Sequence, residues 1–120
     1  MIPNEYIEHA DKIASKSPCN FKVSCLLIDK KGKIVASGYN HHSNIRVMGQ
    51  PTVHAEFDAL KKVRKPSTNL VAFIYRKNGR IITPCQSCYK ILKAYGIMDV
   101  FYTAGEIEDK IEIKRMKIGE

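Results

Sequence analysis

The hydrophobic positions of the chain follow two different periods, one typical of helices and one typical of strands. Over Asn4–Lys16 the apolar residues recur at helical spacing, which predicts an amphipathic helix that ends before Pro18. The segments Phe21–Ile28 and Ile34–Tyr39 are rich in Val, Leu and Ile, so we expect two strands. The intervening Asp29–Gly32 has the composition of a turn, which indicates that the two strands form a hairpin.

The middle of the chain adds a second helix and a buried strand. Asn40–Pro51 is polar and has no period, which indicates an irregular segment. Val53–Lys65 has an apolar face at helical spacing, with Thr52 as the expected N-cap and Pro66 as the stop. Leu70–Tyr75 is an almost continuous apolar run, which is typical of a central strand buried on both faces.

The C-terminal third predicts one more helix and two more strands. Pro84 is expected to open the helix and Gly96 to end it, and strands are expected over Ile97–Tyr102 and Lys110–Met116. The link between these two strands is too short for a parallel crossover, so the last strand should run antiparallel. The sequence therefore predicts a mixed sheet covered by helices, in one α/β domain spanning residues 1–120.

Two motifs with metal-binding chemistry lie at the predicted helix starts. They are His54-Ala55-Glu56 and Pro84-Cys85-Gln86-Ser87-Cys88. Zinc prefers imidazole and thiolate ligands, and two cysteines three residues apart share one face of a helical turn. With His54 as the third ligand, a fourth position remains for water, as in catalytic zinc sites. Glu56 would then lie near the metal without binding it and would carry protons.

Each motif also has a simpler interpretation when it is taken alone. A His-x-Glu sequence arises often by chance, and a Cys-x-x-Cys pair can be a redox pair or half of a structural zinc site. A four-ligand structural site could recruit one of five further side chains. Both motifs together, each at a helix start that follows a strand, predict one zinc ion per chain. The candidates for a fourth structural ligand are Cys19, Cys25, His9, His41 and His42.

The two motifs in this order match the signature of zinc-dependent nucleobase deaminases. The sequence resembles the cytidine deaminase superfamily over nearly its whole length, including the strand at Phe21–Leu27 and the segment Gly38-Tyr39-Asn40. The resemblance implies a three-layer α/β fold with a mixed five-stranded sheet and helices on both faces. The antiparallel last strand is similar to the cytidine and blasticidin deaminase branch, whereas the deoxycytidylate and tRNA adenosine deaminase branch runs parallel there.

The resemblance also implies a role for each matching residue. His54, Cys85 and Cys88 would bind zinc, and Glu56 would move protons. The substrate side would involve the side chain of Asn40 on the ribose, Phe21 against the base, the backbone of Ala55 at the base edge, and Pro84. Phe21 could instead be a core residue, and Asn40 could instead form a turn.

The sequence departs from the cytidine deaminase pattern directly after Asn40. The family commonly has a hydrophobic residue and then a ribose-binding Glu, whereas this chain has His41 and His42. A histidine does not repel a phosphate as a carboxylate does, and Arg46 follows in the same polar segment. We therefore expect His42 and Arg46 to contact the phosphate of a 5′-nucleotide; an exposed segment without contacts is the alternative.

The function expected from these features is zinc-dependent deamination of a cytosine nucleoside or nucleotide. The net charge of +8 leaves open a deaminase of single-stranded DNA or RNA, although a solvated basic surface explains the same charge. A zinc-stabilised binding module without activity is the third hypothesis, and it does not require Glu56. The resemblance implies a homodimer or homotetramer.

The remaining expectations concern the environment of the protein. The first residues lack the basic and apolar runs of a secretory signal, and no apolar run is long enough to cross a membrane. Free thiols and metal-binding cysteines suit a reducing compartment. We therefore expect a cytoplasmic enzyme of pyrimidine nucleotide metabolism.

Overall fold

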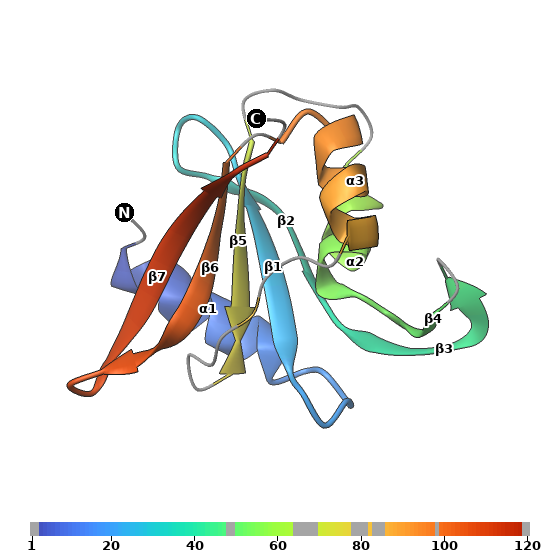
Figure 1. Ribbon diagram of the computed structural model, residues 1–120, viewed down its shortest axis with the longest axis horizontal. Helices are drawn as coiled ribbons and strands as arrows, with labels where there is room; N and C mark the ends of the chain where they lie inside the picture. Colours follow the sequence, from blue (N-terminus) through green and yellow to red (C-terminus); the bar gives the residue numbers. More distant parts are fainter. Residues whose placement is uncertain are drawn as a thin grey trace.

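The computed structural model describes residues 3–47, 50–63, 70–77, 82, 86–97 and 99–118, without the side chains of 43–47, 50–52 and 86–87. A five-stranded sheet in the order β2-β1-β5-β6-β7 forms the middle layer, and β3 and β4 form a separate hairpin beside it (Figure 1). The elements are α1 (Asn4–Ala14), β1 (Val23–Ile28), β2 (Ile34–Tyr39), β3 (His41–Val47), β4 (Gln50–Val53), α2 (Ala55–Leu60), β5 (Val71–Arg76), α3 (Gln86–Ala94), β6 (Asp99–Ile107) and β7 (Lys110–Lys117).

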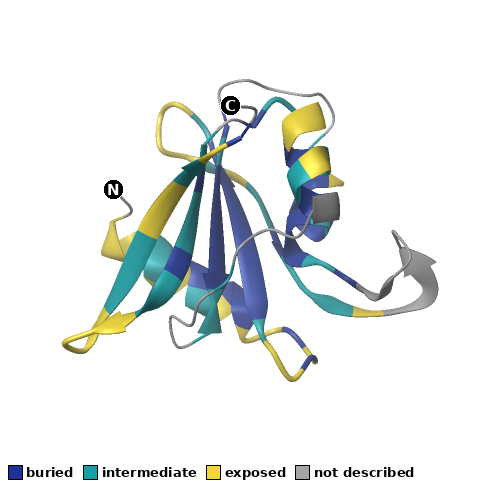
Figure 2. Cartoon of the chain, in the orientation of Figure 1, coloured by how far each residue is buried: buried dark blue, intermediate teal, exposed yellow. Residues whose placement is uncertain are grey.

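The sheet is mixed, and helices cover both of its faces, as the sequence predicted. Among the described strands, only β5 and β6 pair in parallel, while β7 runs antiparallel to β6. One face packs against α2 and α3 through a cluster that includes Leu27 and Ile74, and the other packs against α1 through Leu26 and Phe73. Figure 2 shows the resulting burial of β1 and β5 at the centre of the molecule.

The main difference from the sequence prediction lies between β2 and α2. The segment predicted to be irregular forms the β3–β4 hairpin, in which His41 pairs with Val53 and His42 with Thr52. Thr52 is therefore a strand residue and not the helix N-cap, a position that His54 occupies. The hairpin escaped prediction because strand patterns are recognised by one apolar face, and this segment is polar.

Helix α2 is also shorter than predicted, and α3 is described only from Gln86. The amides of Lys62 and Val63 bond to carbonyls three residues earlier, so α2 tightens and ends well before Pro66. Gly96 has a φ of 79°, in agreement with its predicted position at the end of α3. Pro84 lies outside the described residues.

The link between β6 and β7 is a tight two-residue turn. The strands extend until Ile107 pairs with Lys110, and Glu108 and Asp109 between them have φ values of 49° and 63°. Both turn residues thus adopt a left-handed conformation, which matches the twist of an antiparallel hairpin but is costly for residues with a Cβ. Within the described ranges, no helix has the length and apolar character needed to cross a membrane.

Candidate active site

The residues of the His-x-Glu motif are held where β4 passes into α2. His54 is extended, with φ −74° and ψ 152°, and Ala55 begins the helix on the sheet face shared with α3. Gly38 of β2 lets α2 approach the sheet closely, because a Cβ at this position would lie 2.4 Å from the amide nitrogen of Ala59. This close approach holds the start of α2, and with it Glu56, against the sheet.

The two motifs meet at His54 and Cys88. His54 Nδ1 lies 3.2 Å from Cys88 Sγ, although the residues are 34 positions apart, and Cys88 is fully buried. Two such ligands of one tetrahedral zinc would be separated by about 3.6 Å, given ordinary Zn–N and Zn–S bond lengths. The observed distance is about 0.4 Å shorter than this, so the imidazole nitrogen and the thiol sulfur have the right chemistry and need only a small movement to share a zinc ion. The predicted third ligand, Cys85, lies outside the described residues, and those that are described contain no group of three metal-binding side chains.

Glu56 is buried in the first turn of α2, beside these two side chains. It is 5% exposed, and burial raises the pKa of its carboxyl group, while its own backbone amide, His54 and Cys88 act in the opposite direction. A carboxyl group with a raised pKa can hold a proton nearer neutral pH and release it again. The position and electrostatics of Glu56 therefore suit a proton carrier.

Other candidate ligands from the sequence have different surroundings. Cys25 of β1 is fully buried, and burial, followed by the charge of Glu56, raises the pKa of its thiol well above the ordinary value. His9 is exposed on α1, across the sheet from α2, and His41 Nε2 lies 3.1 Å from the Asp58 carboxylate. The structure does not bring His9 to the site, and it gives His41 a carboxylate partner.

Asn40 joins the end of β2 to the entrance of β1. Its Oδ1 accepts a bond of 2.9 Å from the amide of Val23, and its Nδ2 donates a bond of 2.6 Å to the carbonyl of Phe21. The side chain thus has a structural role, as the turn interpretation implied. The oxygen and the nitrogen of this amide can each form one more hydrogen bond, so a contact with the ribose stays a prediction.

Phe21 lies just before β1 and is 63% exposed, so the interpretation as a core residue is wrong. The guanidinium carbon of Arg76 lies 4.4 Å from the centre of its ring, in a cation–π contact. Because Val23 pairs with Arg76 across the two strands, this contact lies at the same sheet edge as Asn40. The structure thereby places an aromatic ring and a cation next to the predicted ribose ligand.

The predicted phosphate ligands lie on β3. His42 is exposed, and its backbone pairs with that of Thr52 in the hairpin. Arg46 belongs to β3, but its side chain lies outside the described part of the structure. A convergence of His42 and Arg46 therefore stays a prediction.

Asp58 is a site-supporting residue that the sequence interpretation missed. Its carboxylate accepts a bond from the amide of Tyr39, contacts His41, and lies 3.0 Å from Lys61 Nζ. Burial alone would raise the pKa of Asp58, but the bonds from Lys61, Tyr39 and His41 and the charge of Lys62 lower it below the ordinary value. Asp58 thus links β2, β3 and α2 around the motif. The available signal was an acidic residue directly after the apolar Phe57, within the predicted helix Val53–Lys65.

Comparison with known proteins identifies a family that this chain resembles. The sequence profile described as the cytidine and deoxycytidylate deaminase zinc-binding region matches residues 2–104. No curated protein matches the chain significantly.

Solved structures of similar fold belong to the same group of enzymes. Cytidine deaminase from Burkholderia pseudomallei superimposes with a TM-score of 0.68 at 20% identity, over 95% of this chain and 92% of that one. The dCMP deaminase from the cyanophage S-TIM5 gives a TM-score of 0.68 at 24% identity, with coverages of 88% and 86%. Cytidine deaminase from Mycobacterium tuberculosis gives 0.63 at 15% identity, with coverages of 98% and 93%. These likenesses confirm the fold.

Proposed function

Because this chain belongs to the family of the cytidine and deoxycytidylate deaminase zinc-binding region, we propose that it deaminates a cytosine base by zinc-dependent hydrolysis. The observation that carries the proposal is the approach of His54 Nδ1 and Cys88 Sγ to 3.2 Å beside the buried carboxyl group of Glu56. His54, Cys88 and Cys85 would hold one zinc ion per chain. Bound there, zinc would supply Lewis-acid activation of water at neutral pH.

Glu56 supplies the proton transfers of the proposed reaction. Its carboxylate accepts one proton from the water that attacks C4 of the base and passes it to the ring nitrogen. It then accepts the second proton, from the hydroxyl group formed on C4, and passes it to the departing amine. A C–O bond forms, the exocyclic C–N bond breaks, and ammonia leaves. Burial of Glu56 favours this cycle, since it raises the pKa of the carboxyl group from a value too low for holding a proton.

The described residues that would contact the substrate lie at the end of the sheet next to α2. Phe21 offers an exposed ring for the base, and Asn40 offers the remaining hydrogen-bonding capacity of its amide to the ribose. The backbone of Ala55 and the predicted substrate residue Pro84 would border the base. We further propose that the preferred substrate carries a 5′-phosphate. His42 and Arg46 would bind this group, in keeping with the absence of a carboxylate after Asn40.

A single-stranded nucleic acid is the second candidate substrate, and it rests on the charge of +8. Several of the basic side chains already have acidic partners. Lys61 pairs with Asp58, Lys77 lies 3.3 Å from Asp11, and Arg115 lies 2.7 Å from Asp99. Few aromatic residues are interleaved with the basic ones along the sequence, which gives stacking of unpaired bases little support, so we favour a free nucleotide.

A deamination screen with the zinc-loaded protein tests the proposed substrate class. Deoxycytidine, cytidine, their 5′-monophosphates and cytosine-containing single strands of DNA and RNA should be compared by kcat/KM. We expect conversion to the uracil form, with the monophosphate preferred over the nucleoside. His42→Ala and Arg46→Ala should reduce that preference, while Lys114→Ala, on an exposed position of β7, should preserve it. A nucleoside preference in the unaltered protein would contradict the phosphate proposal, and activity on strands alone would favour the second candidate.

A further inference from the structure

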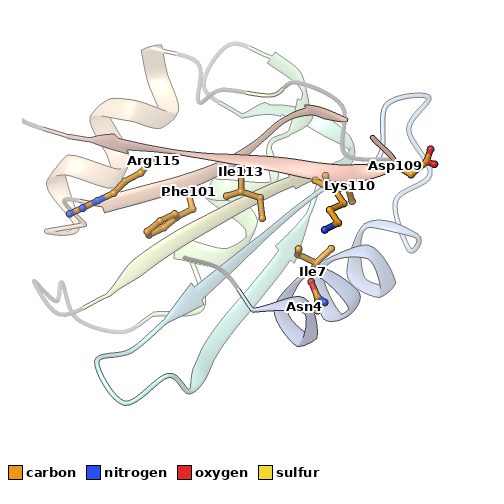
Figure 3. A pocket seen from close by; sticks show the side chains of 8 residues that line it. Asn4, Ile7, Phe101, Asp109, Lys110, Ile113 and Arg115 are labelled. Atoms are coloured by element: carbon orange, nitrogen blue, oxygen red, sulfur yellow. The ribbon is translucent and has the colours of Figure 1, made fainter. Parts of the chain in front are cut away.

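A hollow on the face of the sheet opposite the candidate active site has no role in the proposed reaction. Helix α1 packs mainly against β1, β5 and β2, so it leaves part of β6 and β7 uncovered. Between α1 and these two strands lies a cavity of about 570 Å³ (Figure 3).

The walls of this cavity are mostly apolar. Ile7 comes from α1, Phe101 from β6, and Ile111 and Ile113 from β7, and all four are partly buried and pack against the α1-side core. Figure 3 shows Ile113 and Phe101 side by side along one wall, with Ile7 on the other. A volume of this size with an apolar lining is typical of sites for small organic molecules.

The polar groups at the rim are two cations, one carboxylate and one amide, from Lys110, Arg115, Asp109 and Asn4. Arg115 donates bonds from Nε and Nη2 to Asp99 Oδ1, at 3.0 and 2.7 Å, which fixes its position. Lys110 is exposed, and within the described ranges its ammonium group has no ion pair or hydrogen bond. In Figure 3 Lys110 points into the hollow towards Asn4, whereas Asp109 extends outward from the turn. The cavity therefore presents the ammonium group of Lys110, which has no ion pair within the described ranges, next to an apolar surface.

The turn that carries this lysine is conformationally costly. Glu108 and Asp109 both have positive φ, a conformation that hairpins of this length usually reserve for Asn and Gly. Strained backbone of this kind is retained most often where it serves a site. Here the two-residue turn sets the register that places Lys110 at the mouth of the cavity.

We propose that this cavity binds a small amphipathic anion, with an apolar body against Phe101 and Ile113 and an anionic group near Lys110. Removal of apolar surface from water would supply most of the affinity, and the ammonium group would select an anion over a neutral molecule. The site is separate from the zinc-binding motifs, and the proposal does not depend on the deaminase activity.

Two fluorescent probes of nearly the same shape test the proposal on the zinc-loaded full chain. 8-Anilinonaphthalene-1-sulfonate has an apolar body and one anionic group, and N-phenyl-1-naphthylamine is its uncharged counterpart. We expect one sulfonate probe to bind per chain, and Lys110→Gln to weaken it by up to about fivefold, the range of an exposed ion pair. Lys110→Gln should leave binding of the neutral probe unchanged.

Matched variants separate the cavity from other surfaces. Lys114→Gln removes the same charge from an exposed position of β7 outside the cavity lining, so it should not alter binding of either probe. Ile113→Ser should weaken both probes, with circular dichroism and thermal melting used to verify folding. Equal effects of Lys110→Gln and Lys114→Gln would overturn the proposal. It would also be overturned if the folded protein bound neither probe, or if sedimentation showed a dimer that Ile113→Ser dissociates, since a second chain would then cover the cavity.

Discussion

Asp58 shows how a single buried carboxylate can organise the surroundings of the motif. Its side chain is 6% exposed and meets the amide of Tyr39, the imidazole of His41 and the ammonium group of Lys61. A buried charge is tolerated only when it is paired and hydrogen-bonded, so these partners compensate for its loss of solvation. Asp58 therefore holds the end of β2 and the start of β3 against the helix that bears Glu56.

The lowered pKa of Asp58 predicts a specific dependence of stability on pH. A carboxyl group with a pKa of about 3.9 in the unfolded chain and a lower pKa in the folded chain stabilises the fold at pH values above 3.9. This contribution is lost as the pH falls through the folded pKa. We expect the free energy of unfolding of the unaltered protein to exceed that of Asp58→Asn at pH 7 and the difference to shrink between about pH 5 and pH 2. Urea unfolding at several pH values measures it, and a difference independent of pH would contradict the assignment.

Candidate metal-site residues could be found in the sequence more readily than the burial of individual side chains. His54, Glu56 and Cys88 could be proposed from the sequence because a zinc site would restrict both residue type and spacing, and the structure brings His54 and Cys88 together. Burial could not be read in the same way, because helical periodicity assumes that apolar side chains face the core. In α2, Glu56 and Asp58 are buried whereas Phe57 is only partly buried. At Asp58, hydrogen bonds and ion pairs compensate for burial and override the apolar pattern.

The close packing of β2 against α2 depends on one glycine. A Cβ at Gly38 would lie 2.4 Å from Ala59 N and 2.7 Å from Ala55 O, both backbone atoms that cannot move without shifting the helix. We expect Gly38→Ala to destabilise the protein by about 1–3 kcal/mol through overpacking. It should also lower kcat, since Glu56 moves with α2. The neighbouring Ser37→Ala, in the same strand, should change neither quantity strongly, and a Gly38→Ala protein with unaltered melting temperature and kcat would contradict this account.

The β6–β7 turn makes the opposite prediction, a gain in stability. Replacing Glu108 by Asn and Asp109 by Gly introduces residues that adopt positive φ readily. We expect the double variant to be more stable by about 1 kcal/mol, measured by thermal or urea unfolding. Substituting Asn and Gly at Lys30 and Lys31, in the other hairpin turn, serves as a control, because those residues have no positive φ to relieve. A loss of stability in the Glu108–Asp109 variant would contradict the strain argument.

Elements with a clear apolar period could be predicted from the sequence, and those without one could not. The antiparallel direction of β7 followed from the length of its link to β6, and the structure confirms it. The β3–β4 hairpin was missed because its strands form a separate two-stranded sheet, so a polar composition conceals its pairing. That hairpin carries His41 and His42, so the substrate side of the site was the part least determined by sequence.

At the scale of the whole molecule, the proposed zinc ion would join parts of the chain that are distant in sequence. His54 precedes α2 and Cys88 belongs to α3, so a shared metal would tie the two helices together over the sheet. A ligand that binds only the folded chain stabilises it in proportion to the logarithm of its concentration over Kd.

Removal of the metal should therefore lower thermal stability. With free zinc at about 100 times Kd, chelation would remove about 2.7 kcal/mol, or about 10 °C in Tm for a domain of this size. Cys88→Ala should show a low Tm that no longer responds to zinc, measured by calorimetry with and without a chelator. Cys19→Ala, which also removes a buried cysteine, is the control that should keep its response to zinc. An equal response to zinc in Cys88→Ala and in the unaltered protein would exclude Cys88 as a ligand.

In the proposed reaction Glu56 moves protons beside a zinc ion that it does not bind. The most direct test measures bound zinc and the rate of cytosine-to-uracil conversion side by side in the unaltered protein and in Glu56→Gln, which keeps the size of the side chain. We expect equal zinc in both proteins and a loss of kcat of about 10²–10⁴-fold in the variant. Loss of zinc from Glu56→Gln, or conversion at the rate of the unaltered protein, would contradict it.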